Sequence, residues 1–318
     1  MWHKLESLCY KRDVIYQKWY YLTKIGKCGK EKDVMIKQCI GFMFIIVVIC
    51  MLSMIVVQKS DAKISPNIIQ GMWIFEEGKG KTVEDLSGNG SDGVFVGDIK
   101  WVEGKFGGGI EFTGVEAQNH VRIGTKGNPD SLAALNFKDS KGFSIHAWVL
   151  SSVPPNGKCV IWKGQGCSSW SQYLLGTGAH ENPGGRINQA SFHYRLRSSP
   201  DKFEALGEPL PVNEWVHLVG VWDGSKIHIY VNGKLQNSAD AVGQPWDSPE
   251  AVFIGSDTGC NAGKGRCHWA GIIDEVVIFN MPLTKDEVVS LGNGIEGVLA
   301  VEAAGKTTTT WGKLKSSN

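Results

Sequence analysis

The sequence predicts an all-β protein built as a two-sheet antiparallel sandwich, with one short helix near its C-terminus. The first observation is that short β-rich runs recur between residues 64 and 293 and are separated by Gly, Asn, Asp and Pro. The second is a three-strand meander over residues 215–236. Its turns, Asp223-Gly224 and Asn232-Gly233, accept the positive φ angles of tight hairpins. The third is that no run of helical period interrupts this region before residue 284.

The composition limits the class of partner. The 318 residues carry a formal net charge of +1 and are 42% hydrophobic, which supports a full core in one large β-domain or two ordinary ones. A net charge near zero argues against nucleic acid as the main partner.

An apolar segment over residues 40–57 precedes the β-rich region and is predicted to be helical. Its 18 residues carry no charge, which fits either a transmembrane helix or the apolar part of a secretory signal. Nine Lys and Arg against four acidic residues precede it, so the β-rich region is expected outside the cytoplasm. If Met35 is the true start, residues 60–62 supply the small residues of a cleavage site. The protein is therefore expected to be secreted, or anchored in the membrane through this segment.

Five parts are expected along the chain. They are a basic tail (1–39), the apolar segment (40–57), a linker (58–68), the β-domain (69–293) and a polar tail (294–318). In the tail, residues 297–301 have the composition of an edge strand, whereas a floppy terminus is the alternative.

The predicted strands follow from alternation and turn signals. Besides the meander, they cover residues 69–76, 93–96, 109–113, 120–123, 143–150, 160–163, 172–175, 191–197, 250–255 and 269–279. Residues 215–222 are apolar on both faces, which predicts a strand covered on both sides. The helix signal is Thr284-Lys-Asp-Glu287, a capping box that is followed by apolar residues and ended by Gly292.

Seven motifs of the β-domain coincide in content and order. They are Trp73-Ile-Phe-Glu-Glu, Asp85-Leu-Ser-Gly-Asn-Gly-Ser-Asp-Gly, Gly104-Lys-Phe-Gly-Gly-Gly-Ile-Glu-Phe, Phe143-Ser-Ile-His-Ala-Trp-Val, Trp215-Val-His-Leu-Val, Tyr230-Val-Asn-Gly-Lys and Ile272-Ile-Asp-Glu-Val-Val-Ile-Phe. Together they resemble the laminin-G-like, concanavalin-A-like jelly-roll domains of bacterial extracellular proteins, over residues 69–291. The resemblance implies a jelly roll with a curved concave sheet that binds carbohydrate or protein.

The loop over residues 85–92 is the candidate metal site. Asp85, Asn89 and Asp92 offer oxygen ligands, and the glycines between them let carbonyl groups turn inward, which suits the six to eight oxygens of Ca²⁺. The resemblance adds Asp274 of the last strand as a fourth ligand. A structural calcium ion is therefore the expected cofactor. The alternative is an Asx-rich turn in which Asp85 and Asn89 bond their own backbone.

Four of the eight cysteines fall in the β-domain: Cys159, Cys167, Cys260 and Cys267. An even number in an oxidising compartment predicts disulfides. Local pairs, Cys159–Cys167 and Cys260–Cys267, are the simplest arrangement, and cross-pairing such as Cys167–Cys260 is the alternative. A zinc site is less favoured because no Cys-x₂-Cys spacing occurs.

An enzyme is not expected. Related jelly-roll glucanases carry Glu-x-Asp-x-x-Glu on one strand, and this chain has no such triple. Asp274 and Glu275 are adjacent and are expected to point to opposite faces of their strand. The histidines show no metal-ligand or Ser/His/Asp spacing.

Aromatic and planar polar side chains near loops are the candidate ligand contacts. Sugar recognition stacks an aromatic ring on an apolar sugar face and adds oriented hydrogen bonds. The candidates are Trp170, Arg195, Trp246, His268 and Trp269, although a core position is the alternative for Trp269. The expected function is an extracytoplasmic binding or adhesion module for carbohydrate. A protein-interaction or cell-surface structural domain is the alternative, and a divergent glycosidase the third hypothesis.

Overall fold

The computed structural model describes residues 63–114, 119–124, 130–165, 170–178, 188–196, 202–256 and 267–299, together with Gln17. The chain divides into two compact units, residues 1–60 and 61–318, and the second unit contains all the strands of the described residues. The predicted apolar helix at 40–57 lies outside the described residues. Among the residues that are described, no helix combines the length and apolarity needed to cross a membrane.

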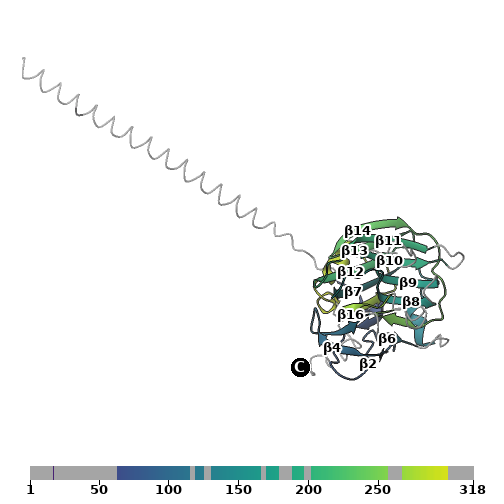
Figure 1. Ribbon diagram of the computed structural model, residues 1–318. Helices are drawn as coiled ribbons and strands as arrows, with labels where there is room; N and C mark the ends of the chain where they lie inside the picture. The colour runs from purple at the N-terminus through teal and green to yellow at the C-terminus, as the bar shows by residue number, and fades with distance from the viewer. Residues whose placement is uncertain are drawn as a thin grey trace, which may run out of the picture. The chain divides into compact units, whose positions relative to one another are not determined.

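Two antiparallel sheets pack against each other, which confirms the predicted sandwich (Figure 1). The first sheet has the order β14 (Lys234–Asp240), β13 (Lys226–Val231), β12 (Trp215–Trp222), β7 (Phe143–Ser151), β16 (Ala270–Phe279), β5 (Gly108–Thr113) and β4 (Ile99–Glu103), with β1 (Ile69–Trp73) also on β16. The second has the order β11 (Lys202–Pro209), β10 (Gln189–Arg195), β9 (Trp170–Thr177), β8 (Cys159–Gln165), β15 (Val252–Ile254), β6 (His120–Ile123), β3 (Gly93–Val96) and β2 (Thr82–Val83).

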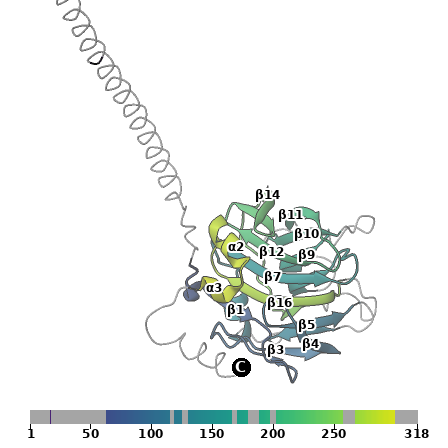
Figure 2. The same ribbon diagram turned by 90° about the vertical axis from the view of Figure 1, so that its left-hand side faces the viewer.

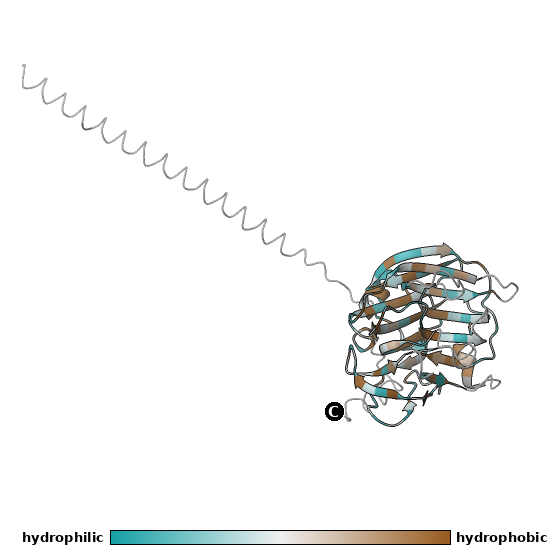
Figure 3. Ribbon diagram, in the orientation of Figure 1, coloured by the Kyte–Doolittle hydropathy of each residue, from teal (hydrophilic) through white to brown (hydrophobic). Residues whose placement is uncertain are grey.

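The main core lies between the two sheets and follows the alternation seen in the sequence. On β7, alternate residues join this core, and the residues between them face the other side; the core residues are Phe143, Ile145, Ala147 and Val149. On the opposite sheet, Phe192 and Tyr194 of β10 pack against the Phe143 ring, with ring centroids 5.7 and 6.3 Å away. Figure 3 shows the resulting mixture of hydrophobic and hydrophilic segments along the strands.

Two short helices, α2 (Lys285–Leu291) and α3 (Ile295–Val298), follow the last strand (Figure 2). Leu291 and Ile295 pack with Val219 of β12 and Val277 of β16 in a second apolar cluster on the outer face of the first sheet. The predicted capping box is confirmed: the Glu287 backbone N–H donates to Thr284 Oγ1 at 3.3 Å. Two 3₁₀ helices, η1 (Pro66–Ile68) and η2 (Asp130–Leu135), complete the elements of the described residues.

The C-terminal segment differs from the prediction. Residues 295–298 form α3, so the edge strand expected over 297–301 is wrong for residues 297 and 298, whereas Leu299 forms an isolated parallel bridge with Ile64. The backbone N–H of Ile64 donates to the Val298 carbonyl at 2.8 Å, and Ile64 and Leu299 are buried. Packed residues therefore begin before residue 69 and continue past residue 293.

Three strands have too weak a sequence signal to be predicted: β2, β4 and β11. Each lies at an end of its sheet, where only one neighbour is present. An edge strand needs less apolar surface than a central one, and β11 carries Lys202, Glu204, Gly207 and Pro209 among its residues. The alternation that reveals the central strands is therefore weak in these three.

Strand β16 changes its partner along one edge. Residues 270–273 pair with β5, and residues 276–279 pair with β1, while β7 lines the other edge. The change occurs at Glu275, whose φ of 46° is uncommon for a residue with a side chain. Because Ile273 and Val276 both enter the main core, this bulge places both Asp274 and Glu275 on the outer face. The expectation that they point to opposite faces is wrong for this reason.

Candidate functional site

The outer face of the second sheet carries a row of polar side chains. On β10, Ser191, His193 and Arg195 alternate with the core residues Phe192 and Tyr194, so they face outward. All three are buried nonetheless. The neighbours of β10 are β9 and β11, which lie on either side of it in Figure 1.

Two hydrogen bonds and one longer contact connect residues of three adjacent strands into what we call the polar row: Ser171, Ser191, His193 and Glu204. Ser171 Oγ lies 2.8 Å from His193 Nε2. Ser191 Oγ donates to Glu204 Oε1 at 2.8 Å, and the same carboxylate oxygen lies 3.9 Å from His193 Nδ1. The row thus combines hydroxyl, imidazole and carboxylate groups over β9, β10 and β11.

A bulge in β9 explains why Ser171 joins this row. The pairing of β9 with β8 shifts between Lys163 and Gly164, which leaves Gln172 as the extra residue. Gln172 Nε2 donates to Asn136 Oδ1 at 2.5 Å and to the Trp246 carbonyl at 2.6 Å. Ser171 is turned to the outer face as a result.

An apolar cluster lies on the same outer face beside the polar row. It contains Cys159, Trp162, Leu174, Ala251, Phe253 and Cys267. The ring centroids of Trp162 and Phe253 are 5.8 Å apart, and His120 meets Phe253 edge-on at 5.4 Å. Cys159 and Cys267 were selected from the sequence only as disulfide residues. Trp162, Leu174 and Phe253 were not selected because they lie within strands, where their alternation with core residues was the only available sequence signal.

The structure brings two of the predicted ligand residues together. The backbone N–H of Trp246 donates to the Arg195 carbonyl at 2.9 Å. Trp246 is half-buried, and Arg195 and His268 are buried. Trp170 begins β9, and its side chain lies outside the described part of the structure. These four assignments stay predictions.

Trp269 is a core residue. Its side chain is 0% exposed, and it belongs to the main cluster between the sheets. Its Nε1 donates to the Leu150 carbonyl at 3.4 Å. The expected ligand contact is therefore wrong for Trp269, because a fully buried ring presents no face to a sugar.

The Asp85 loop bonds its own backbone extensively. Asp85 Oδ1 accepts hydrogen bonds from the backbone N–H groups of Met72 and Ser87, both at 3.0 Å, and Oδ2 accepts from Ser91 at 2.9 Å. Asn89 Nδ2 donates to the Gln70 carbonyl at 3.1 Å, and Asp92 Oδ1 accepts from the Asp85 backbone at 2.8 Å. For Asp85 this is the bonding that the Asx-turn alternative predicts, whereas the Asn89 side chain bonds the backbone of β1 and not that of its own loop. Calcium binding at this loop stays a prediction.

Asp274, the fourth predicted ligand, stabilises the turn between β4 and β5 and not the Asp85 loop. Its Oδ2 accepts hydrogen bonds from the backbone N–H groups of Lys105 and Phe106, at 2.8 and 2.9 Å, between β4 and β5. Burial raises the pKa of Asp274 to about 7. Within the described residues, no group of three or more His, Cys, Asp or Glu is arranged to hold a metal ion.

Two of the four cysteines of the β-domain can be placed. Cys159 and Cys267 are buried, and the Cys159 backbone N–H donates to the Cys267 carbonyl at 2.8 Å. Cys167 and Cys260 lie outside the described residues. The predicted disulfide pairs therefore stay predictions.

The fold places the chain in a class of proteins, the jelly-roll domains of the concanavalin A-like type. The family model described as the concanavalin A-like lectin/glucanases superfamily (Laminin_G_3) matches residues 109–289. The chain belongs to this family, which confirms the resemblance inferred from the seven motifs. A search of curated proteins finds no match.

Several solved structures share this fold. Domain 4 of AbnA, a GH43 extracellular arabinanase from Geobacillus stearothermophilus, was solved in complex with arabinotriose; it is 17% identical with a TM-score of 0.52, over 70% of this chain and 98% of that one. The binding domain of botulinum neurotoxin DC was solved in complex with rat synaptotagmin II. It is 14% identical with a TM-score of 0.51, over 72% of this chain and 52% of that one.

A third similar structure is the binding domain of Paraclostridial mosquitocidal protein 1. It is 15% identical with a TM-score of 0.51, over 72% of this chain and 52% of that one. This chain thus spans about half the length of either toxin domain. At these identities the likeness shows the fold alone.

Proposed function

We propose that this protein is an extracytoplasmic carbohydrate-binding module, and that it binds sugar through the outer face of its second sheet. The observation that carries the proposal is the polar row, in which the partly exposed Glu204 carboxylate is held in place by Ser191. Sugars present many hydroxyl groups, so a protein site for them needs oriented polar groups on its surface. The Trp162 and Phe253 rings of the neighbouring cluster are 2% and 6% exposed, and they therefore support the strands instead of stacking on a sugar.

The polar row suits hydroxyl recognition because its members are fixed before a ligand arrives. Glu204 is held by Ser191, and His193 is held by Ser171, so neither side chain loses much rotamer freedom on binding. The Glu204 side chain is 12% exposed, and its carboxylate can accept strong hydrogen bonds from sugar hydroxyls.

Similar structures support a sugar or a cell-surface partner. AbnA domain 4 was solved with arabinotriose, and cell entry of botulinum neurotoxin type C depends on interaction with two ganglioside molecules. The neurotoxin DC domain in complex with synaptotagmin makes protein binding the second candidate.

A catalytic role is not proposed, because a similar fold does not by itself assign any chemistry. The structural calcium ion remains part of the proposal, with Asp85 as its central ligand.

The test is a glycan array with the full chain in a buffer without sugar-based detergent, in calcium and in EDTA. Binding in calcium alone supports a lectin whose site depends on the ion. Binding in both conditions supports a lectin whose sugar site does not depend on calcium, so that the ion is either structural or not bound. A folded protein that binds no glycan contradicts the carbohydrate proposal and favours the protein partner.

The variant Glu204→Gln locates the site. It removes the negative charge and keeps the size of the side chain, so affinity should fall roughly 10- to 100-fold, as expected for a hydrogen bond to a charged group. Glu208→Gln is the matched control, since Glu208 lies on the same strand and is exposed. If both variants bind the glycan with the same affinity as the parent, Glu204 does not contact the sugar, and the proposed location of the site is contradicted.

A further inference from the structure

The outer face of the first sheet is partly covered by the segment that holds α2 and α3, which we call the helical cover (residues 285–299). Leu291, Ile295 and Val298 of this cover are buried in the second apolar cluster, together with residues of β1, β12, β13 and β16. This cluster is distinct from the main core between the two sheets. The cover can therefore leave the sheet in a local opening that does not expose the main core.

Two histidines lie beneath the helical cover as a hydrogen-bonded pair, His146 of β7 and His217 of β12. His146 Nδ1 lies 2.8 Å from His217 Nε2, and the two residues are 0% and 1% exposed. A Cβ atom built on Gly292, which follows α2, would lie 3.8 Å from His217 Nδ1. The backbone of the helical cover thus passes next to the pair and keeps water away from it.

The protons on the pair determine its charge. In the neutral pair one proton lies between the rings, and a second lies on an outward nitrogen, either His146 Nε2 or His217 Nδ1. A further proton occupies the remaining outward nitrogen and gives the buried pair a positive charge. Among the described residues His217 Nδ1 has no hydrogen-bond partner, so a proton there is left unsatisfied. Burial of a charged and unsatisfied group is strongly unfavourable, and contact with water relieves it.

Glu275 couples the pair to the helical cover. Its Oε2 lies 3.6 Å from His146 Nε2, and both of its carboxylate oxygens accept from the Ile295 backbone N–H at 3.1 Å. Ile295 is the first residue of α3. A proton on His146 Nε2 therefore competes with Ile295 for the same carboxylate, and this weakens the attachment of α3.

The other charged and titratable groups around the pair compensate its charge poorly. In the described residues, Glu275 is the one carboxylate within 4 Å of either ring. Asp274 already accepts from backbone N–H groups of the β4–β5 turn, and Glu76 and Glu296 are exposed, so water screens them. The remaining groups on the packed elements are Tyr230 of β13, Lys105 of the β4–β5 turn and the charged residues 285–287 of α2.

The helical cover also holds the chain that precedes β1. The Ile64 backbone N–H donates to the Val298 carbonyl at 2.8 Å, and Ile64 and Leu299 form an isolated parallel bridge. Lys63 Nζ donates to the Gly297 carbonyl at 3.2 Å. Departure of the cover therefore frees residues 63 and 64 as well.

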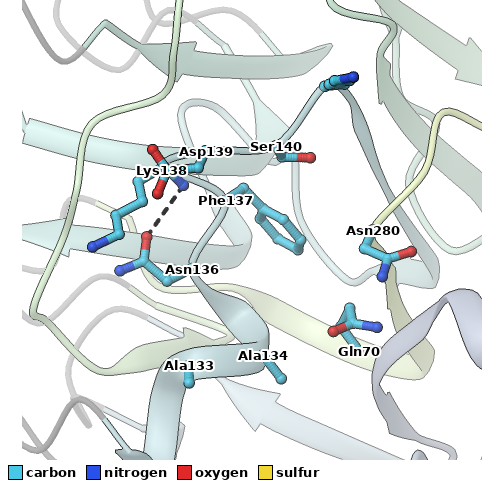
Figure 4. A pocket seen from close by; sticks show the side chains of 10 residues that line it. Gln70, Ala133, Ala134, Asn136, Phe137, Lys138, Asp139, Ser140 and Asn280 are labelled. Carbon is cyan, nitrogen blue, oxygen red and sulfur yellow. Dashed lines mark hydrogen bonds between the residues drawn. The ribbon is translucent and has the colours of Figure 1, made fainter.

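From η1 onward the chain is held independently of the helical cover. The Asn280 backbone N–H donates to the Ile68 carbonyl at 2.9 Å. Gln70 of β1 and Asn280, which follows β16, line one pocket at this junction (Figure 4). Because β1 pairs directly with β16, the sheet stays intact when the cover leaves.

We propose that the His146–His217 pair is an acid-operated release for the helical cover. When the pair takes up a proton, the cover leaves the first sheet, residues 63 and 64 are freed, and the two sheets stay folded. The opening exposes apolar residues of the outer face, such as Val219 and Val277. This release lies on the first sheet and is independent of the sugar site proposed on the second.

The release is driven by a fall in pH. Burial lowers the pKa of His146 to about 3, and burial together with His146 lowers the pKa of His217 well below its usual value. In the open state, where water reaches both rings, the pKa values return to about 6.5. The open state thus binds more protons than the closed state, and its population rises as the pH falls from about 6.5 toward 3.

The test is hydrogen–deuterium exchange of the full chain, followed by mass spectrometry between pH 7.5 and 4 and corrected for the intrinsic effect of pH on exchange. We expect peptides from residues 284–299 to exchange roughly 10-fold faster at pH 4 than at pH 7.5, whereas peptides from β7 and β10 keep their protection. His146→Gln and His217→Gln keep a hydrogen-bonding side chain without a titratable ring, so both should remove this response. His228→Gln is the matched control, because His228 lies in β13 of the same sheet with a partly exposed side chain, and it should respond as the parent does.

Loss of the response in one of the two variants assigns the proton to that ring and supports the release. An unchanged response in both variants overturns it, as does a parent whose residues 284–299 keep their protection down to pH 4. Simultaneous loss of protection in residues 284–299 and in β7 also overturns it, because the sheets then open together with the cover. The last two measurements need only the parent, so a histidine variant that fails to fold leaves the test intact.

Discussion

His146 and His217 face each other across β7 and β12, with His146 Nδ1 2.8 Å from His217 Nε2. Both side chains are buried on the outer face of the first sheet, and the His217 ring stacks on Trp148 at 5.1 Å. The other nitrogen of His146, Nε2, lies 3.6 Å from Glu275 Oε2. A chain of titratable groups therefore connects the middle of the sheet to the bulge in β16.

Acid should destabilise the protein through this histidine pair. Burial lowers the pKa of His146 to about 3, and burial together with His146 lowers the pKa of His217. The unfolded chain takes up protons below about pH 6.5, whereas the folded chain does not, so stability is lost as pH falls from 6.5 toward 3. Urea unfolding of His146→Gln should show a smaller loss than the parent over this window. An identical pH dependence would contradict the assignment.

Glu275 should give the opposite pH dependence, so that stability falls as the pH rises. Burial raises its pKa to about 8, so the folded state binds a proton that the unfolded state releases. Stability from this group is complete below about pH 4.5 and is lost as pH rises through 8. Glu275→Gln should therefore flatten the stability curve between pH 5 and 8.5, with a difference of about 1–3 kcal/mol across it. The exposed Glu208→Gln variant serves as control and should follow the parent.

Calcium should raise the melting temperature if the Asp85 loop binds it. The measurement is thermal unfolding in EDTA and at millimolar calcium, for the parent, Asp85→Asn and the exposed Asp98→Asn. Asp85→Asn should lower stability in both buffers by about 1–3 kcal/mol, because its carboxylate accepts three backbone hydrogen bonds. Only the parent and Asp98→Asn should gain stability from calcium. A parent that does not respond rules out this site.

Gly220 of β12 is needed for the close approach of the two sheets. A Cβ atom at this position would lie 2.2 Å from the Phe192 ring on the opposite sheet. Gly220→Ala should destabilise the fold by about 1–3 kcal/mol, because neither sheet can move without disturbing the main core. Gly297→Ala is the control: no atom lies within 4 Å of its Cβ position, and it falls in α3. That variant should be neutral or stabilising in urea unfolding.

The disulfide prediction can be settled by peptide mapping without reduction. We expect Cys159–Cys167 and Cys260–Cys267 as local pairs. A hydrogen bond joins the backbones of Cys159 and Cys267, so the two segments that carry the cysteines lie side by side. Pairing of a cysteine of one segment with a cysteine of the other is therefore geometrically possible. Detection of a Cys167–Cys260 peptide would contradict the local pairing.

Much of the fold was predictable because its signals are local. The turns of the meander lie at Asp-Gly and Asn-Gly, as predicted, and Asn232 and Gly233 have φ angles of 50° and 74°. In the first turn only Gly224 has a positive φ, of 92°. The helix follows from its capping box. The candidate site was harder to predict from the sequence. Trp246 and Arg195 were predicted as ligand contacts and do lie together, whereas His193, Ser171 and Glu204 were not predicted.

The sequence by itself determined which residues form central strands, where the hairpins turn and which helix closes the domain, because alternation, turn residues and caps act over a few positions. Only the tertiary structure decided that Trp269 is buried, that Asp274 and Glu275 share one face, and that three strands place a serine, a histidine and a glutamate in one row. Each of these depends on bulges and on pairing between strands far apart in the chain, and a single strand's sequence does not contain its neighbour's register.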